Sequence, residues 1–315
     1  MDRSSPFFGQ VELLIRALPH VAKQECFALK GGTAINLFVR ELPRLSVDID
    51  LVYLPLEARE KALPAIGEAL GKIKADIEAA MPGATVQATR IGDTDSQRLT
   101  LSDSGHRIKI ELSPVLRGTV WPVEWREVRE KVEKTFGYAG IQVVSIRDLY
   151  AGKICAALDR QHPRDLFDVK QLFENEGIDR DIIKTFLVYL ISHGRPMSEL
   201  LSPVRRDIGN LFETEFREMT DEPISLEELL KTRERLIAHI HASLTDQDRA
   251  FLLSVKAGTP DWSLIDLEGI NELPAVKWKL INLSRMREDR HAAALRRLEQ
   301  VLEEGDKHEE PEGSD

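Results

Sequence analysis

The sequence predicts an α+β protein in which a small mixed-sheet domain, residues 1–143, precedes an α-helical domain, residues 144–302. Short segments that alternate apolar and polar residues, separated by turn residues, are concentrated before residue 115 and indicate strands. From Val144 onward, apolar residues recur at three- and four-residue steps, which indicates helices. The length of 315 residues is sufficient for two domains of ordinary size.

The elements of the first domain follow from apolar spacing and turn residues. Helices are expected at 10–23, 33–39 and 57–80, and strands at 46–54, 85–91, 97–102 and 107–113. The links GDTDS and DSG between the last three strands carry turn chemistry, which predicts a meander. The segment 116–136 mixes tryptophans, prolines and charges, and its second half fits a strand or a loop.

Two carboxylates, Asp48 and Asp50, lie on the strand expected at 46–54. Side chains of a strand alternate between its faces, so both acids point to one side and the apolar residues between them to the other. Two like charges side by side repel, and a divalent cation such as Mg²⁺ removes the conflict. Upstream, Gly31 and Gly32 let backbone N–H groups approach an anion at a helix N-terminus. The combination indicates phosphoryl or nucleotidyl transfer, and the alternative is a solvated strand face.

The glycine pair, a fifteen-residue spacer and Asp48-x-Asp50 resemble the signature of the DNA polymerase β-like nucleotidyltransferase superfamily. The fuller string GGTAINLF…RLSVDIDLVY resembles the AbiEii/AbiGii-type toxins of bacterial toxin–antitoxin systems, and LPAVKWKLINL extends the resemblance to about residue 302. The resemblance implies a polymerase β-like fold, an NTP substrate, a two-metal Mg²⁺ site and a cognate antitoxin. It also implies that the acceptor is the 3′ end of a tRNA, whose extension blocks translation and growth.

The superfamily takes a third carboxylate from a strand in the position of residues 107–113, and Glu111 is the match. The clean alternation of RIKIELS puts Glu111 opposite its apolar neighbours. If helices cover one side of the sheet, Glu111 lies on the same open face as Asp48 and Asp50. The resemblance then makes these three residues the metal ligands; the alternative for Glu111 is an exposed charge on an edge strand.

A second group of charged residues follows Ser145, the expected N-cap of a helix that ends at Arg160 before Pro163. Lys153 and Arg160 are seven residues apart and share a helix face. The resemblance makes Lys153 the phosphate contact and Asp168 a downstream acid. The members that match the toxin pattern are Lys153, Arg160, Arg164, Asp165 and Asp168. The alternative is a structural ion-pair cluster, because acids are favoured in the first turn of a helix.

Taken together, the expected site has a catalytic and a nucleotide-binding set. The catalytic residues are Asp48, Asp50, Glu111, Lys153 and Asp168, and the nucleotide-binding residues are Gly31, Gly32, Thr33, Ser46, Lys153 and Arg160. In some relatives a hydroxyl at the position of Ser46 is phosphorylated by the antitoxin. A phosphate there would repel both carboxylates and substrate, so Ser46→Glu is expected to inactivate. The alternative is a serine that only initiates the strand.

The second domain is expected to be helical, with helices at 181–192, 202–217, 225–243 and 245–257 and one long helix ending near 302. Lys277 to Arg297 carries seven lysines and arginines against two acids, which makes it the best RNA-contacting segment, unless it is a solvated helix face. Trp278 is expected in the core. The tail 303–315 has seven acids and one lysine, and is expected to be disordered.

Composition excludes several classes of protein. A net charge of −10 argues against a protein that coats nucleic acid, and no apolar run approaches a membrane span. The N-terminus lacks a signal-peptide pattern, so a cytoplasmic location is expected. The isolated Cys26 and Cys155 fit structural thiols, and no histidine–cysteine cluster supports zinc. Two other functions remain open: NTP transfer to a protein or small-molecule hydroxyl, and a non-enzymatic toxin that binds nucleotide or sequesters a partner.

Overall fold

The computed structural model describes residues 7–90, 97–220 and 222–306, and its chain divides into two compact units. The first unit comprises Met1–Leu149 and Glu215–Pro223, and the second comprises Tyr150–Thr214 and Ile224–Asp315. The division therefore falls after Leu149 rather than after residue 143, and a short later segment returns to the first unit.

A seven-stranded mixed sheet forms the first unit, with the order β3-β4-β5-β2-β1-β7-β6. Its strands are β1 (Phe27–Lys30), β2 (Asp48–Tyr53), β3 (Thr85–Arg90), β4 (Gln97–Asp103), β5 (His106–Arg117), β6 (Glu124–Glu127) and β7 (Gly140–Val143). The pairs β2–β5 and β1–β7 are parallel, and the other neighbours are antiparallel. The α+β class and the predicted meander, which is β3-β4-β5, are confirmed.

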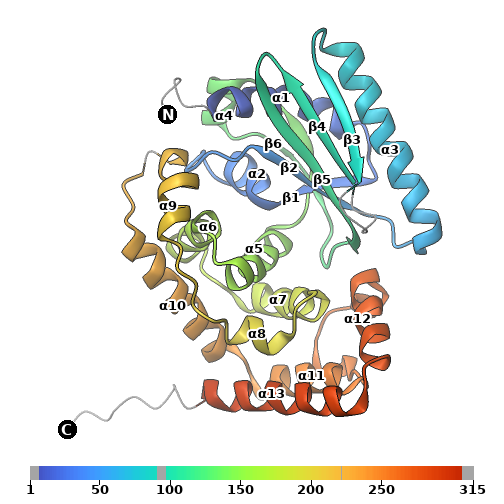
Figure 1. The fold of residues 1–315 in the computed structure, drawn as a ribbon, viewed down its shortest axis with the longest axis vertical. Coiled ribbons are helices and arrows are strands. Elements are labelled where there is room, and N and C mark those ends of the chain that lie inside the picture. Colours follow the sequence, from blue (N-terminus) through green and yellow to red (C-terminus); the bar gives the residue numbers. More distant parts are fainter. Residues whose placement is uncertain (1–6, 91–96, 221, 307–315) are drawn as a thin grey trace. The chain divides into compact units, whose positions relative to one another are not determined.

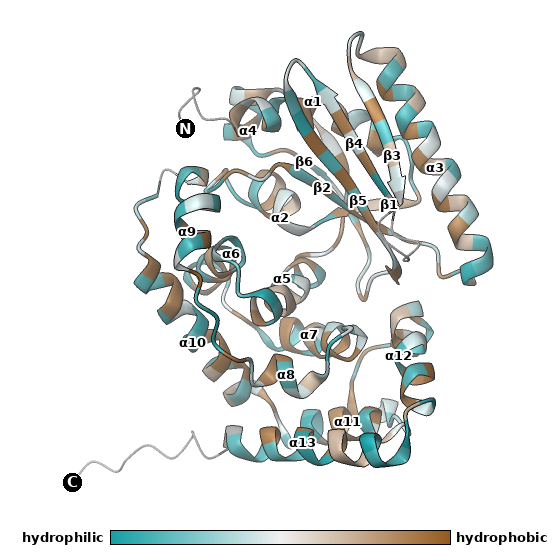
Figure 2. Ribbon diagram, viewed as in Figure 1, coloured by the Kyte–Doolittle hydropathy of each residue, from teal (hydrophilic) through white to brown (hydrophobic). Residues whose placement is uncertain are grey.

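Helices cover the apolar face of this sheet. They are α1 (Phe8–Ala22) and α3 (Arg59–Ala80), and α4 (Glu130–Phe136) packs on α1. After β1, the short α2 (Gly31–Thr33) continues as the π-helix η1 (Ala34–Val39). Helices α1 and α3 pack on the strands (Figure 1), where Ile49, Leu51 and Ile110 are fully buried. Figure 2 shows the matching alternation of hydrophobic and hydrophilic residues along the strands. The segment 128–136, for which a strand or loop was expected, contains α4. The Arg129 carbonyl accepts the N–H of Glu133 at 2.9 Å in its first turn, and Arg129 N–H donates to Leu37 O at 2.8 Å.

The segment 215–223, which includes the 3₁₀-helix η2 (Arg217–Met219), fixes the loop before β2. Leu45 donates its backbone N–H to the carbonyl of Met219 at 2.7 Å, and the Thr220 hydroxyl donates to the carbonyl of Pro43 at 2.9 Å. These contacts span more than 170 residues of sequence, so no local pattern predicts them. They hold the chain that delivers Asp48 to the sheet.

The second unit is helical, as expected. Its helices are α5 (Ile146–Arg160, which starts in the first unit), α6 (Pro163–Glu174), α7 (Arg180–Ser192), α8 (Met197–Leu201), α9 (Gly209–Glu215), α10 (Leu226–Ser243), α11 (Asp246–Ala257), η3 (Trp262–Leu264), η4 (Ile270–Glu272), α12 (Pro274–Ser284) and α13 (Glu288–Asp306). Ser225 and Thr245 each form a capping box, which sets the starts of α10 and α11 where the sequence places them.

Three expectations about this unit are wrong. The chain at 202–208 is not helical, because Pro203 lacks an N–H and Asp207 accepts the N–H of Gly209 at the start of α9. The long terminal helix is two helices, and the Ser284 hydroxyl, which bonds back to Ile281 O, marks the end of the first. Helix α13 continues to Asp306, so the predicted tail begins as helix; residues 307–315 lie outside the described residues.

Several smaller expectations concern single side chains. Trp278 is 45% exposed and is not a core residue. Both cysteines are free thiols, and burial raises the pKa of the Cys155 thiol. Across the ranges described here, none of the helices combines the length and apolar character that a membrane crossing needs.

Candidate functional site

Three carboxylates share one face of the sheet in the first unit. Strands β2 and β5 are parallel neighbours, and their register pairs Asp50 directly with Glu111. Paired residues of adjacent strands point to the same face, and Asp48 lies two residues before Asp50 on that face. Ile49 and Leu51 are buried on the opposite face, whereas both aspartates are partly exposed. The register therefore places Glu111 beside the aspartates, as expected.

The glycine turn before α2 lies against the Asp50 carboxylate. Gly31 has a φ of +75°, and a Cβ added there would come within 2.5 Å of Asp50 Oδ2. Both the backbone conformation and the space exclude a larger residue at this position. A Cβ on Gly32 would meet Arg44 Nη2 at 2.8 Å and Ser46 Oγ at 2.9 Å. The two glycines thus allow the turn to pack directly on the strand that carries the acids.

Thr33 and Ser46 connect this turn to β2 rather than facing solvent. Thr33 is fully buried, and its hydroxyl lies 3.0 Å from Ser46 Oγ and donates to the carbonyl of Asp48 at 2.5 Å. The buried guanidinium of Arg44 packs under Gly32 and next to Ser46. The hydroxyls and the guanidinium therefore fix the distance between the glycine turn and the aspartates.

Cations flank the carboxylates across the sheet. In register, the row reads Lys30 on β1, Asp50, Glu111 and then Arg98 on β4. Arg98 Nη2 lies 2.5 Å from Glu111 Oε1. Lys109, on the same face, is paired in register with Asp48. Positive groups therefore border both ends of the acidic pair.

The donor set suits a hard divalent cation, because three carboxylates on two adjacent strands supply oxygen ligands. Within residues 7–90, 97–220 and 222–306, however, no three or more His, Cys, Asp or Glu side chains converge on one point as a metal-binding group. The Glu111 carboxylate is instead drawn to Arg98. The strand register thus puts the three carboxylates on one face, and Glu111 is engaged by Arg98 rather than turned toward the aspartates.

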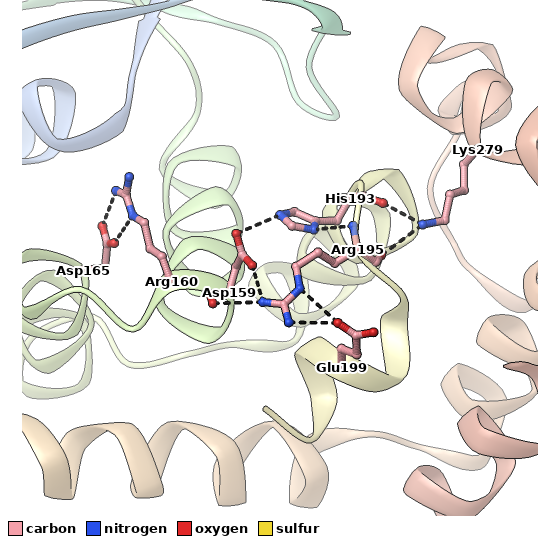
Figure 3. A network of polar contacts seen from close by, with 7 residues as sticks. All are labelled: Asp159, Arg160, Asp165, His193, Arg195, Glu199 and Lys279. Carbon is pink, nitrogen blue, oxygen red and sulfur yellow. Dashed lines mark hydrogen bonds and ion pairs between the residues drawn. The ribbon is translucent and has the colours of Figure 1, made fainter. Parts of the chain in front are cut away.

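The charged residues of α5 and α6 form a separate, buried cluster in the second unit. Lys153 Nζ lies 2.8 Å from Asp165 Oδ1 and 2.9 Å from Asp168 Oδ2, and all three side chains are at least 94% buried. Arg160 also binds Asp165, at 2.5 Å from its Nε, and is itself 57% exposed (Figure 3). Burial alone would raise the pKa of Asp165, but the charges of Lys153 and Arg160 outweigh it and hold that pKa well below its usual range.

A buried glutamine shapes the turn that brings these charges together. Gln161 follows α5 and has a φ of +53°, which is unusual for a residue other than glycine. Its side chain donates to Val204 O at 2.8 Å and accepts from Arg206 N at 2.9 Å and from Arg233 Nη1 at 3.1 Å. These bonds, together with Pro163 at the first position of α6, hold the sharp turn between α5 and α6.

A further polar network connects α5, the chain after α7 and α12 (Figure 3). Arg195 binds Asp159 at 2.7 Å, and Lys279 donates to the carbonyls of His193 at 2.6 Å and Arg195 at 3.1 Å. Burial lowers the pKa of Lys279 to about 8, and the nearby charge of Lys256 adds to the effect. The Lys279 ammonium is therefore bonded to backbone carbonyls of the same unit, and the expected RNA-contacting segment has one available cation fewer.

The predicted residues thus fall into two groups, each brought together within its own unit. Glycines, hydroxyls and carboxylates of the first group surround β2: Gly31, Gly32, Thr33, Ser46, Asp48, Asp50 and Glu111. The second group is Lys153, Arg160, Asp165 and Asp168. Sequence reasoning missed Arg98, Arg44 and Gln161. The alternation of β4 could have placed Arg98 on the polar face, whereas the roles of Arg44 and Gln161 depend on tertiary packing.

Comparisons with known proteins bear on the fold and the family of this chain. A search of solved structures finds MenT4, a nucleotidyltransferase toxin from Mycobacterium tuberculosis H37Rv, with a TM-score of 0.59 and 16% sequence identity over 88% of this chain and 93% of that one. At this identity the likeness shows a common fold. A comparison with curated protein sequences finds no match. The profile of the family described as "Nucleotidyl transferase AbiEii toxin, Type IV TA system" matches residues 12–282. The chain therefore belongs to the AbiEii family of nucleotidyltransferase toxins of type IV toxin–antitoxin systems.

Proposed function

We propose that this nucleotidyltransferase toxin transfers a nucleoside monophosphate from an NTP to the 3′ end of a tRNA in a Mg²⁺-dependent reaction. The observation that carries the proposal is the register of β2 and β5, which puts Asp48, Asp50 and Glu111 on one polar face beside the Gly31 turn. Family membership implies a nucleotide substrate and a cognate antitoxin. The metal is inferred from the chemistry of that face, and the acceptor from the resemblance to the toxin family and from the basic segment 277–297.

The three carboxylates would hold Mg²⁺, because hard oxygen ligands match it and because the acids otherwise repel one another. When bound, the metal would offset the charge of the triphosphate and lower the pKa of the acceptor hydroxyl. Asp48 and Asp50 hold their positions through β2, and Gly31 sets how closely the turn approaches Asp50.

In the reaction, the acceptor hydroxyl gives up its proton to water and its oxygen forms a bond to the α-phosphorus, while the bond from that phosphorus to the bridging oxygen breaks and pyrophosphate leaves. The leaving phosphates gain negative charge, which a guanidinium or ammonium stabilises. Among the predicted phosphate contacts, Arg160 presents an exposed guanidinium, whereas Lys153 is buried between two aspartates. Within the second unit, Arg160 therefore has the more accessible cationic group of the two, and Lys153 is the buried partner of Asp165 and Asp168.

A tRNA acceptor is supported by the basic segment 277–297 and by Trp278. This side chain is 45% exposed between Lys277 and the internally bonded Lys279. An exposed aromatic ring on a basic segment is a platform on which a single-stranded base stacks. A tRNA with an altered 3′ end no longer serves translation, so growth would stop until the antitoxin acts. The cytoplasm, where tRNA and NTPs are present, is the expected location.

The acceptor is tested by incubating the protein with each α-³²P-labelled NTP, Mg²⁺ and either total RNA or total protein from the same cells. Label in the tRNA band from one NTP, and none in the protein fraction, is the expected result. Label in the protein fraction alone would replace tRNA by a protein hydroxyl. Asp50→Asn serves as the control for contaminating activity, because it removes a carboxylate charge without changing the size of the side chain.

A further inference from the structure

The guanidinium of Arg98 is only partly satisfied by its contact with Glu111. Nη2 lies 2.5 Å from Glu111 Oε1, in a pair whose side chains are 31% and 33% exposed. The Nε atom of the same guanidinium is buried and has no hydrogen-bond partner in the part of the chain that the structure describes. An arginine carries five N–H donors in a planar fork, so this side chain retains donors for a second oxygen-rich ligand.

Glu111 lies between two competing partners. In register it stands between Asp50 on one side and Arg98 on the other. A cation held by Asp48 and Asp50 would attract Glu111 away from Arg98. The present contact opposes this move only weakly, because ion pairs at this degree of exposure contribute little net stability.

We propose that Arg98 exchanges partners during substrate binding: it releases Glu111 to the divalent cation, and its guanidinium then binds a phosphate of the NTP. This inference rests on the proposed function of the three carboxylates. Strands β4 and β2 are separated by one strand, which corresponds to about 10 Å, and a flexible arginine side chain covers much of that distance. A planar guanidinium matches two phosphate oxygens at once, as it matches a carboxylate.

The exchange predicts two effects of opposite sign in Arg98→Gln. Without nucleotide, the variant should bind Mn²⁺ several-fold more tightly than the wild type, because Glu111 no longer has a competing partner and a nearby positive charge is gone. With saturating Mn²⁺, it should bind the α,β-methylene analogue of the preferred NTP about tenfold more weakly, because a charged hydrogen-bond donor is lost. Titration calorimetry measures both affinities directly and does not depend on turnover.

A matched control is Arg107→Gln. It also removes one positive charge from the polar face of the sheet, on β5 and four residues from Glu111. Both of its affinities should stay at the wild-type level. Arg98→Lys keeps the charge without the planar fork, so it should preserve the Mn²⁺ affinity and weaken the binding of the analogue. Thermal unfolding of all variants confirms that they are folded.

The outcomes separate the exchange from the proposed function. Mn²⁺ binding that is unchanged or weaker in Arg98→Gln would overturn the exchange, as would unchanged binding of the analogue. Loss of both affinities together would assign Arg98 a structural role instead. If Asp50→Asn leaves Mn²⁺ binding at the wild-type level, the carboxylate face is not the metal site, and the proposed function falls together with the exchange.

Discussion

The polar face of the sheet and the α5–α6 cluster use the same residue types in opposite ways. On the sheet, Asp48, Asp50 and Glu111 are partly exposed, and acids stand side by side. Between α5 and α6, Lys153 is buried with Asp165 and Asp168 and is within ion-pair distance of both. A charge-balanced buried cluster stabilises a fold or positions its members, whereas partly exposed neighbouring acids present oxygen atoms that suit a divalent cation. The comparison is the reason that the proposed metal chemistry is placed on the sheet and a structural role at the α5–α6 cluster.

The largest expected effect is on catalysis at the sheet. Asp50→Asn should reduce nucleotide transfer by about a thousandfold or more, because a metal ligand loses its charge. Its thermal unfolding temperature should not fall, since the variant relieves the repulsion between neighbouring acids. Transfer from labelled NTP, measured beside differential scanning calorimetry, checks both statements. A folded Asp50→Asn protein with wild-type transfer would remove the sheet from the chemistry.

The next largest effect is on stability at the α5–α6 cluster. Lys153→Met should lower the free energy of unfolding by about 3–5 kcal/mol, because it leaves buried carboxylates without their shared cation. Any loss of activity in this variant would then arise at least partly from the lower stability of the fold. Arg160→Gln removes a more exposed cation and should cost much less stability. Chemical denaturation measures both, and equal stability of the wild type and Lys153→Met would contradict the structural role.

Gly31→Ala probes the contact between the glycine turn and the strand. A side chain there would be forced into a left-handed conformation and against Asp50 Oδ2, so a loss of about 1–2 kcal/mol is expected. Gly71→Ala in α3 is the matched control, because a Cβ there meets nothing within 4 Å and alanine favours a helix. The control should be neutral or stabilising. Equal unfolding temperatures for the two variants would show that the turn does not need glycine at position 31.

The last expected effect, which is confined to one pH window, is a pH dependence at Lys279. Burial lowers its pKa in the folded protein to about 8, whereas an unfolded lysine titrates near 10.4. Between these values the unfolded state binds more protons, so the free energy of unfolding should rise with pH in that window. The difference between the wild type and Lys279→Met, followed by denaturation from pH 7 to pH 10.5, isolates this contribution.

Local patterns in the sequence were sufficient for features that depend on neighbours in the chain. The two-residue period of β2 and β5 placed Asp48, Asp50 and Glu111 on one face, and Ser225 and Thr245 marked the helix starts. Features that depend on distant contacts were not predictable. The segment 215–223 bonds to the loop before β2 from more than 170 residues away, and the Arg98–Glu111 pair depends on the exact register of β4.

The roles of charged residues were also harder to assign than their positions. Lys153 and Arg160 share a helix face, as expected, yet only the structure shows that one is buried between two aspartates and the other is exposed. Thr33 and Ser46, expected as nucleotide contacts, have hydroxyls that bond to each other and to the backbone of Asp48. Burial decides whether such a side chain contacts substrate or supports the fold, and burial depends on tertiary packing.

The most direct test of the assignment is the location of Mn²⁺ by anomalous X-ray scattering from crystals of the protein grown with MnCl₂ and a non-hydrolysable NTP analogue. The account predicts an anomalous peak between the carboxylates of Asp48, Asp50 and Glu111, and no peak at Asp165 or Asp168. A peak at the α5–α6 cluster, with none on the sheet, would contradict it and move the metal chemistry to the second unit.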